Sequence, residues 1–171
     1  MKRIEPFWDD EYKKLNYRKE IFNDEYAIQG WREQGYQNPI ESFSGEMANH
    51  GDVQPKWNDG IVKWATEVQE LQDVGCCYYR MKTNTIIPNH TDAYNVYTEK
   101  FNCKTEQVVK ILVFLEDWKS GHYFELEGKP MLEWKAGNYA SWNGRTEHFA
   151  ANIGVENRYT LQITCLRHTT Y

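Results

Sequence analysis

The sequence predicts a mainly β fold, a sandwich or barrel, preceded by helices in its N-terminal part. From Cys76 onward, apolar and polar residues alternate with the period of a β-strand. Turn-forming residues divide this part into about eight short segments, a number typical of sandwiches and barrels. The 171 residues suffice for one domain. We divide it into a helix-and-loop region, residues 1–75, packed on a β core, residues 76–171.

Two helices are expected in the N-terminal region. The first spans residues 9–22, where apolar residues recur at helical spacing. The second follows Asn58-Asp59, its apolar stripe reaches residue 72, and Gly75 lies where a helix C-terminus favours glycine. This stripe is expected to pack against the sheet. Between the two helices, frequent Gly, Pro and Asn residues over 30–55 predict an irregular stretch.

The β core is divided by turn signals that contain Asn, Gly, Ser or Pro. The chain also has seven Trp and twelve Tyr residues, which suit a sheet-based core or a lined pocket. Between the turn signals we expect strands at residues 76–82, 85–90, 107–115, 122–126, 131–135, 139–142, 147–152 and 158–166.

Two histidines and one aspartate of the β core form a candidate metal site. His90 and Asp92 are two positions apart at the end of an expected strand, so both side chains project to the same face. His148 begins another expected strand and supplies a second imidazole. Two His and one carboxylate are the ligand set of non-haem Fe(II) oxygenases, which leave three metal positions open. Arg158, ten positions after His148, is permanently charged and can bind a carboxylate with two parallel hydrogen bonds.

In this order and spacing, the four residues resemble the signature of the 2-oxoglutarate- and Fe(II)-dependent dioxygenases. The signature of that family is His-x-Asp, a distal His, and an Arg about ten residues later, here His90, Asp92, His148 and Arg158. Thr160 stands where the family often has Ser or Thr two residues after the Arg.

The resemblance covers about the last hundred residues and not the first seventy. Residues 79–92 are similar to the strand that leads into the family's motif, with one departure, because Asn84 stands where many members have Gly. Segments 122–124 and 158–164 resemble members that marine phages carry.

The resemblance implies a fold, cofactors and an activity. The fold would be a double-stranded β-helix, a jelly roll of the cupin-like type. His90, Asp92 and His148 would be the catalytic metal ligands for Fe(II), and Arg158 with Thr160 would bind the cosubstrate 2-oxoglutarate. With O2, such an enzyme hydroxylates its substrate and releases succinate and CO2. The substrate would be an amino acid, a peptidyl side chain such as prolyl, or a small metabolite.

Each of these residues also has a simpler interpretation. A lone His-x-Asp is common and is usually a turn-forming Asp beside a surface His, and a lone strand Arg usually forms a surface salt bridge. The combination of all four residues, each next to an expected strand, favours the metal site. The alternative function is a non-catalytic, cupin-like module that binds a metal or a small ligand. Its usual His-x-His motif followed by Glu is absent, because Asp92 replaces the second His.

Candidates for substrate binding are less well defined. Tyr78 and Arg80 share one face of an expected strand, and Arg80 is equally suited to a salt bridge. Asn95 follows the His-x-Asp motif and is a candidate to line the mouth of the pocket; the simpler interpretation is a solvated loop. Lys110 alternates with apolar residues. Some branches of the resembled family bind the keto acid through a lysine on a nearby strand, which Arg158 makes less necessary here.

Composition limits the partners. The net charge is −5 and the basic residues are dispersed, so binding to nucleic acid is not expected. No apolar run is long enough for a membrane span, and the N-terminus lacks the pattern of a signal peptide. The four cysteines form no Cys-x-x-Cys pair. We therefore expect a cytoplasmic protein that binds a small molecule or a peptide; the sequence does not indicate an oligomeric state.

Overall fold

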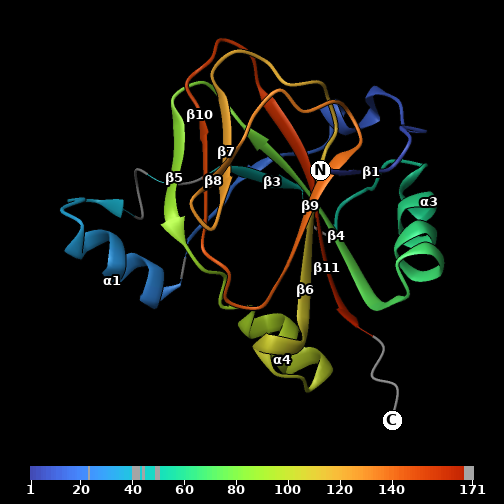
Figure 1. The fold of residues 1–171 in the computed structure, drawn as a ribbon, viewed down its shortest axis with the longest axis horizontal. Helices are drawn as coiled ribbons and strands as arrows, with labels where there is room; N and C mark the ends of the chain where they lie inside the picture. The colour runs from blue at the N-terminus through green and yellow to red at the C-terminus, as the bar shows by residue number, and fades with distance from the viewer. Residues whose placement is uncertain (23, 40–42, 44, 49–50, 168–171) are drawn as a thin grey trace.

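The computed structural model describes residues 1–22, 24–39, 43, 45–48 and 51–167 (Figure 1). Within them, two antiparallel sheets are formed. The seven-stranded large sheet has the order β1 (Lys2–Arg3), β9 (Asn138–Asn143), β6 (Val108–Phe114), β11 (Arg158–Arg167), β4 (Leu71–Met81), β3 (Glu46–Ala48) and β2 (Arg18–Lys19). The four-stranded small sheet has the order β5 (Thr85–His90), β10 (His148–Asn152), β7 (His122–Leu126) and β8 (Lys129–Met131).

The helices lie around these sheets. Figure 1 shows α3 beside the large sheet, α1 near β5 of the small sheet, and α4 at one end of the molecule. None of the helices in the described residues combines the length and apolar character that crossing a membrane requires. The helical elements are the 3-10 helix η1 (Asp10–Lys14), α1 (Glu25–Glu33), α3 (Asn58–Lys63), the π-helical turn η2 (Trp64–Val68), α4 (Asn95–Phe101) and the 3-10 helix η3 (Thr105–Gln107).

The core has two layers, one on each face of the large sheet. On β6, Leu112 and Phe114 belong to the cluster between the sheets, which also includes Phe124 of β7. Alternate residues of the same strand face the other way and pack with Ile61 of α3 and with Tyr12. The central strands of the large sheet, such as β6, are largely buried on both faces because the N-terminal region covers the outer one.

Two expectations for the N-terminal region were wrong. Residues 9–22 do not form one helix. The short helix η1 begins at its N-cap Asp9, and the chain is extended from Leu15, so that Arg18 and Lys19 pair with β3 at the sheet edge. Pairing with a strand satisfies backbone groups that a short charged helix would leave to water. The stretch expected to be irregular, residues 30–55, begins inside α1, which ends at Glu33, and contains the strand β3; its residues 40–42, 44, 49 and 50 lie outside the described residues.

The boundary expected at residue 75 lies inside a strand. The second helix was expected to reach residue 72, but helical structure ends at Val68 and β4 starts at Leu71. Gly75 is therefore in the middle of β4, opposite Thr164 of β11, and is not a helix stop. Positive φ values at Glu70 and Asp73 accompany this change from helix to strand.

The expected strands of the β core are largely present. The strand expected at 131–135 is instead β8, which begins two residues earlier at Lys129 and includes Pro130 at the sheet edge, where its missing N–H costs no ladder bond. Asn95 begins the helix α4, so this segment is not the solvated loop of the simpler interpretation. The turn between β4 and β5 places Asn84 at a φ of 63°, the left-handed conformation that Gly or Asn adopts most readily.

Candidate metal centre

The two histidines meet because their strands are neighbours. His90 ends β5 and His148 begins β10, and the antiparallel register pairs these two residues directly. Paired residues of adjacent antiparallel strands have neighbouring side chains on one face. The centroids of the two imidazole rings are 4.3 Å apart.

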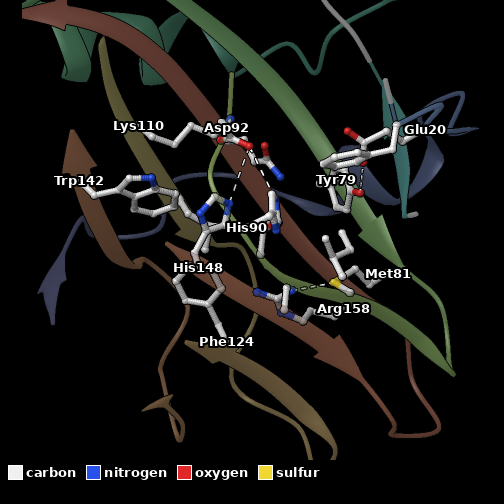
Figure 2. Close-up of a pocket in the computed structure, with 16 residues that line it drawn as sticks. Glu20, Tyr79, Met81, His90, Asp92, Lys110, Phe124, Trp142, His148 and Arg158 are labelled. Carbon is white, nitrogen blue, oxygen red and sulfur yellow. Dashed lines mark hydrogen bonds and ion pairs between the residues drawn. The ribbon is translucent and has the colours of Figure 1, made fainter. Parts of the chain in front are cut away.

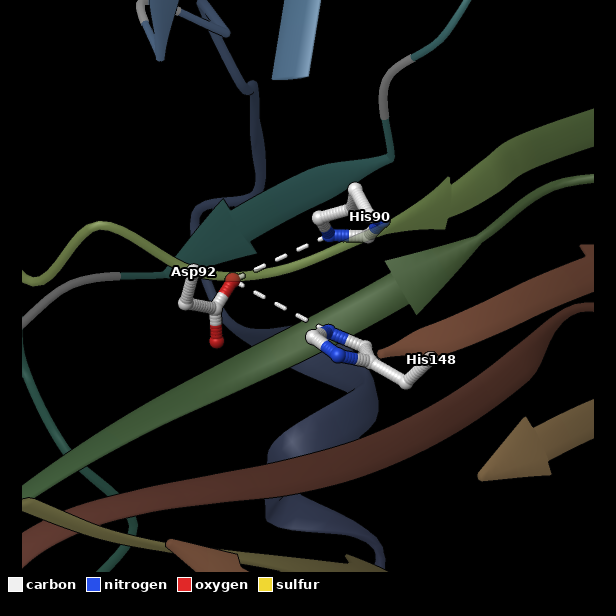
Figure 3. Close-up of side chains that lie close together, drawn as sticks. All are labelled: His90, Asp92 and His148. Atoms are coloured by element: carbon white, nitrogen blue, oxygen red, sulfur yellow. Dashed lines mark ion pairs between the residues drawn. The ribbon is translucent and has the colours of Figure 1, made fainter. Parts of the chain in front are cut away.

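Asp92 completes the group from the segment just beyond β5 (Figure 3). Its Oδ1 atom is 3.7 Å from Nε2 of His90 and 3.8 Å from Nε2 of His148. One ligand atom from each residue can be chosen so that all three lie within 4.8 Å of one another. Among the described residues, this is the group of His, Cys, Asp and Glu side chains that could hold a metal ion.

The hydrogen bonds of the histidines prepare them as ligands. Nδ1 of His90 is 2.7 Å from the carbonyl oxygen of Pro88, and Nδ1 of His148 is 3.0 Å from that of Thr146. A carbonyl oxygen can only accept, so in the neutral ring Nδ1 carries the proton and donates it. Both Nε2 atoms are left with free lone pairs directed towards Asp92, the tautomer that binds a metal through Nε2.

The electrostatics of the site also favour metal binding. Burial and the neighbouring His148 lower the pKa of His90 to about 4, so the ring stays neutral in neutral solution. Burial alone would raise the pKa of Asp92, but Lys110 and the two histidines outweigh it and hold that pKa well below its usual range. A neutral imidazole at His90 and an ionised carboxylate at Asp92 are both donors that suit a divalent first-row metal.

Aromatic rings enclose the centre. The rings of Phe22 and Trp31 lie 5.4 Å and 5.6 Å from the ring of His90, and Trp142 lies 5.2 Å from the ring of His148. Trp31 is fully buried, and its Nε1 donates to the carbonyl oxygen of Asn89, the residue before His90. The N-terminal region therefore helps to fix the first ligand.

Arg158 faces the centre from the other sheet (Figure 2). It begins β11 and is only 3% exposed. It lines a cavity, here called the inner cavity, together with Thr160 and the three residues of the metal centre. The inner cavity measures about 50 Å³, so a ligand the size of a dicarboxylic acid enters it only if side chains move.

The guanidinium of Arg158 lacks an acidic partner among the described residues. Its Nη1 donates to the sulfur of Met81 at 2.8 Å, while Nε and Nη2 are buried and have no hydrogen-bond partner within the described part of the chain. The rings of Phe114, Phe124 and Trp134 surround it at 5.6–5.8 Å. Burial lowers the pKa of Arg158 to about 10. An unpaired buried cation is costly, and a bound anion would offset that cost.

The structure places the three expected substrate residues, Tyr78, Arg80 and Asn95, in different parts of the molecule. Tyr78 lies in the outer core layer, where its hydroxyl donates to Asn58, and Arg80 pairs with Glu46 at 2.5 Å. Neither Tyr78 nor Arg80 lines the inner cavity. Asn95 does line a second, more open cavity of about 720 Å³, here called the outer cavity.

Some residues that line the site were not assigned to it from the sequence. The face of β4 that meets the inner cavity carries Tyr79 and Met81, which lie directly opposite Thr160 and Arg158 in the sheet. Glu20 comes from the N-terminal region and lines both cavities, as does Lys110, whose Nζ is 3.6 Å from Oδ2 of Asp92. No sequence motif marks Glu20 as a site residue. For Lys110, its alternation with apolar residues on a strand was a pattern that could have indicated a position at the site.

Comparison with solved structures identifies the fold of this chain. No family model matches the sequence, and no curated protein matches it. A crystal structure of a prolyl-4-hydroxylase from Pseudomonas putida aligns with 93% of this chain and 96% of its own, with a TM-score of 0.53 and 12% identity. The fold is a double-stranded β-helix. This confirms the fold class expected from the sequence, mainly β with N-terminal helices.

Two further solved structures align with this chain at lower TM-scores. A cupin protein from Bacteroides fragilis has a TM-score of 0.41 and 11% identity, over 62% of this chain and 76% of its own. A Klebsiella pneumoniae protein with a double-stranded β-helix domain has a TM-score of 0.39 and 12% identity, over 57% and 71%. At 12% identity, the likeness to the prolyl-4-hydroxylase shows the fold and not the activity. Within this fold, His90, Asp92 and His148 form a group that could hold a metal ion.

Proposed function

We propose that this protein is an Fe(II)- and 2-oxoglutarate-dependent oxygenase that hydroxylates a small-molecule or peptide substrate. The observation that carries the proposal is the buried guanidinium of Arg158, which has two unpaired nitrogens and lines the same cavity as His90, Asp92 and His148. A metal site alone needs no such cation. A dicarboxylic cosubstrate that binds the metal at one end needs a fixed positive charge for the other end.

The roles of the residues follow from their positions. His90, Asp92 and His148 would hold the iron through Nε2, a carboxylate oxygen and Nε2. When bound, ferrous iron supplies the redox chemistry, in which O2 and 2-oxoglutarate are consumed and hydroxylated substrate, succinate and CO2 are formed. Arg158 would receive the far carboxylate of 2-oxoglutarate through its unpaired N–H groups, and the hydroxyl of Thr160 would add a hydrogen bond.

The surrounding side chains would exclude water from the reaction. Phe124 and Trp142 line the inner cavity with apolar surface, so the charges inside it interact in a medium of low dielectric constant. The same apolar walls make the Arg158 guanidinium a poor site for water and a strong site for an anion.

Anaerobic addition of Fe(II) and 2-oxoglutarate tests the proposal. We expect a weak visible absorption band in the wild-type protein and its loss in Asp92→Ala. Arg158→Met should bind Fe(II) like the wild type but need at least about 30-fold more 2-oxoglutarate, because loss of a buried ionic partner costs roughly 2–5 kcal/mol. Arg167→Met is the matched control, because Arg167 lies on the same strand, is exposed, and lines neither cavity.

The alternative is a cupin-like module that binds a metal or small ligand without catalysis. It predicts iron binding with no 2-oxoglutarate-dependent band and no succinate. Succinate formed by aerobic protein with iron and 2-oxoglutarate, and lost in Arg158→Met, would exclude this alternative. Iron binding that survives Asp92→Ala unchanged would contradict both interpretations.

A further inference from the structure

The outer cavity adjoins the metal centre. It shares Asp92, Glu20 and Lys110 with the inner cavity, and its volume of about 720 Å³ is that of a site for a small ligand or a side chain. Aromatic rings from the segment before α4 and from α4, including Tyr94 and Phe101, line part of its wall. A substrate in this cavity would lie next to Asp92, so its recognition depends on the groups that the two cavities share.

Glu20 is one of these shared groups, and its position is fixed. Its backbone N–H donates to the carbonyl oxygen of Gly45 at 3.0 Å, and its side chain accepts a short hydrogen bond from the hydroxyl of Tyr79. That hydroxyl in turn accepts from the backbone N–H of Gly45 at 2.9 Å. Figure 2 shows Glu20 and Tyr79 together at the wall of the inner cavity. These hydrogen bonds fix the position of the Glu20 carboxylate.

The charge of Glu20 is not balanced by an ion pair within the described residues. Lys110 lines the same cavities and its charge acts on Glu20 from a distance, but its Nζ forms its ion pair with Asp92, at 3.6 Å. Asp24, another acidic residue of the outer cavity, is used as the N-cap of α1. Burial raises the pKa of Glu20, which means that its surroundings do not compensate the charged form fully. A cation from outside the chain would compensate it.

Building on the proposed oxygenase function, we propose that Glu20 binds a positively charged nitrogen of the substrate. The substrate is then a molecule with an ammonium or guanidinium group, either free or as a side chain of a peptide. Its charged nitrogen is held at Glu20, and the rest of it occupies the outer cavity beside Asp92. A substrate without such a group, for example a prolyl peptide, would leave the half-buried carboxylate of Glu20 without a charged partner.

Equilibrium binding of charged and neutral isosteres tests this. The probes are L-arginine against L-citrulline and L-lysine against L-norleucine, titrated into protein loaded with Mn(II) and 2-oxoglutarate, which does not turn over. We expect each charged member to bind at least about tenfold more tightly than its neutral partner. Nα-acetyl-arginine amide distinguishes a free amino acid from a peptide side chain as the substrate. Only a site for peptides should bind this compound as tightly as it binds L-arginine.

Glu20→Gln should remove the preference and bind arginine and citrulline equally. The amide keeps the size of the side chain and can still accept from Tyr79. The matched control is Glu125→Gln, because Glu125 also accepts a tyrosine hydroxyl, that of Tyr123 at 2.6 Å, but lines neither cavity. Glu125→Gln should keep the preference for arginine over citrulline.

The result can be separated from the proposed function. Wild-type protein that binds 2-oxoglutarate but treats charged and neutral probes alike, or binds none of them, overturns the role of Glu20 alone. The same holds if Glu20→Gln keeps the preference. Failure of 2-oxoglutarate to bind at all refutes the oxygenase, and the titrations repeated without metal and cosubstrate still report on Glu20.

Discussion

The contact between Arg158 and Met81 explains how a carboxylate could enter the small inner cavity and bind Arg158. A thioether sulfur is a weak acceptor, so this 2.8 Å contact returns little of the free energy that burial of the guanidinium costs. A carboxylate is a much stronger partner for the same nitrogen. Met81 is also unbranched and flexible, so it can move aside with little strain.

Binding of 2-oxoglutarate should therefore displace the Met81 side chain. With methyl-13C-methionine labelling and Mn(II) replaced by diamagnetic Zn(II), we expect the Met81 signal to shift when 2-oxoglutarate is added. The Met131 signal is the internal control, because Met131 is packed against the same core layer but lines neither cavity. A Met81 signal that stays constant while 2-oxoglutarate binds would place the cosubstrate elsewhere.

The lowered pKa of His90 predicts how stability depends on pH. Its pKa is about 4 in the folded protein and near 6.5 in an unfolded chain, so between these values the unfolded state binds more protons. The stability contributed by the neutral ring is present above pH 6.5 and is lost as the pH falls towards 4. Metal-free protein should lose about 2 kcal/mol of unfolding free energy from pH 7 to pH 5 through this residue.

Urea denaturation at the two pH values, in the presence of a chelator, measures this loss. His90→Gln lacks the titrating group and should show a smaller loss by about that amount. His122, which is buried and also has a pKa lowered mainly by burial, contributes in the same direction and remains in both proteins. An equal loss in wild type and variant would refute the assignment.

Strand registers explain which parts of the site the sequence could predict. His90, Asp92, His148 and Arg158 were predicted because each lies next to a strand end with clear turn signals. The sequence indicated Tyr78, whereas its neighbour Tyr79 lines the inner cavity. Both faces of β4 are largely buried, so the residue pattern does not distinguish them. A shift of one residue in the pairing of β4 with β11 exchanges the two faces.

The N-terminal elements could not be placed from the sequence. Nothing in residues 20–31 marks Glu20, Phe22 or Trp31 as neighbours of the centre, because their contacts are made across long sequence separations. α1 is a single short helix whose place depends on packing of its apolar face rather than on its helix propensity. The metal ligands themselves come from the sheet, and the groups around them come from elsewhere in the chain.

α1 should nevertheless affect metal binding through Trp31. Trp31→Phe keeps an aromatic ring but removes the hydrogen bond to Asn89, which should lower the unfolding free energy by roughly 1–3 kcal/mol. It should also weaken Mn(II) binding by about tenfold, as loss of a group that supports a ligand does.

Trp118→Phe controls for the general effect of such a change. Its Nε1 also donates to a backbone oxygen, that of His122 at 2.8 Å, but it lines neither cavity. It should destabilise the fold without changing the Mn(II) affinity. Calorimetric titration and urea denaturation of both variants separate the two effects, and equal Mn(II) affinities in both would show that α1 only stabilises the fold.

For the molecule as a whole, the two sheets carry different halves of the proposed site. His90 and His148 belong to strands of the small sheet and Asp92 follows β5, whereas Arg158 and Thr160 belong to the large sheet. A metal alone would bind the small-sheet side only. A dicarboxylate that contacts the metal and Arg158 would connect the sheets and oppose their separation, which unfolding requires.

Thermal unfolding should reveal this connection. A ligand at 100 times its Kd stabilises the folded state by about 2.7 kcal/mol, which raises Tm by roughly 5–10 °C for a chain of this size. Mn(II) should produce one such rise, and 2-oxoglutarate a second rise that appears only when Mn(II) is present. Arg158→Met should keep the first and lose the second, while Asp92→Ala loses both. A 2-oxoglutarate effect of the same size with and without Mn(II) would mean that the cosubstrate does not bridge the two sheets through the metal.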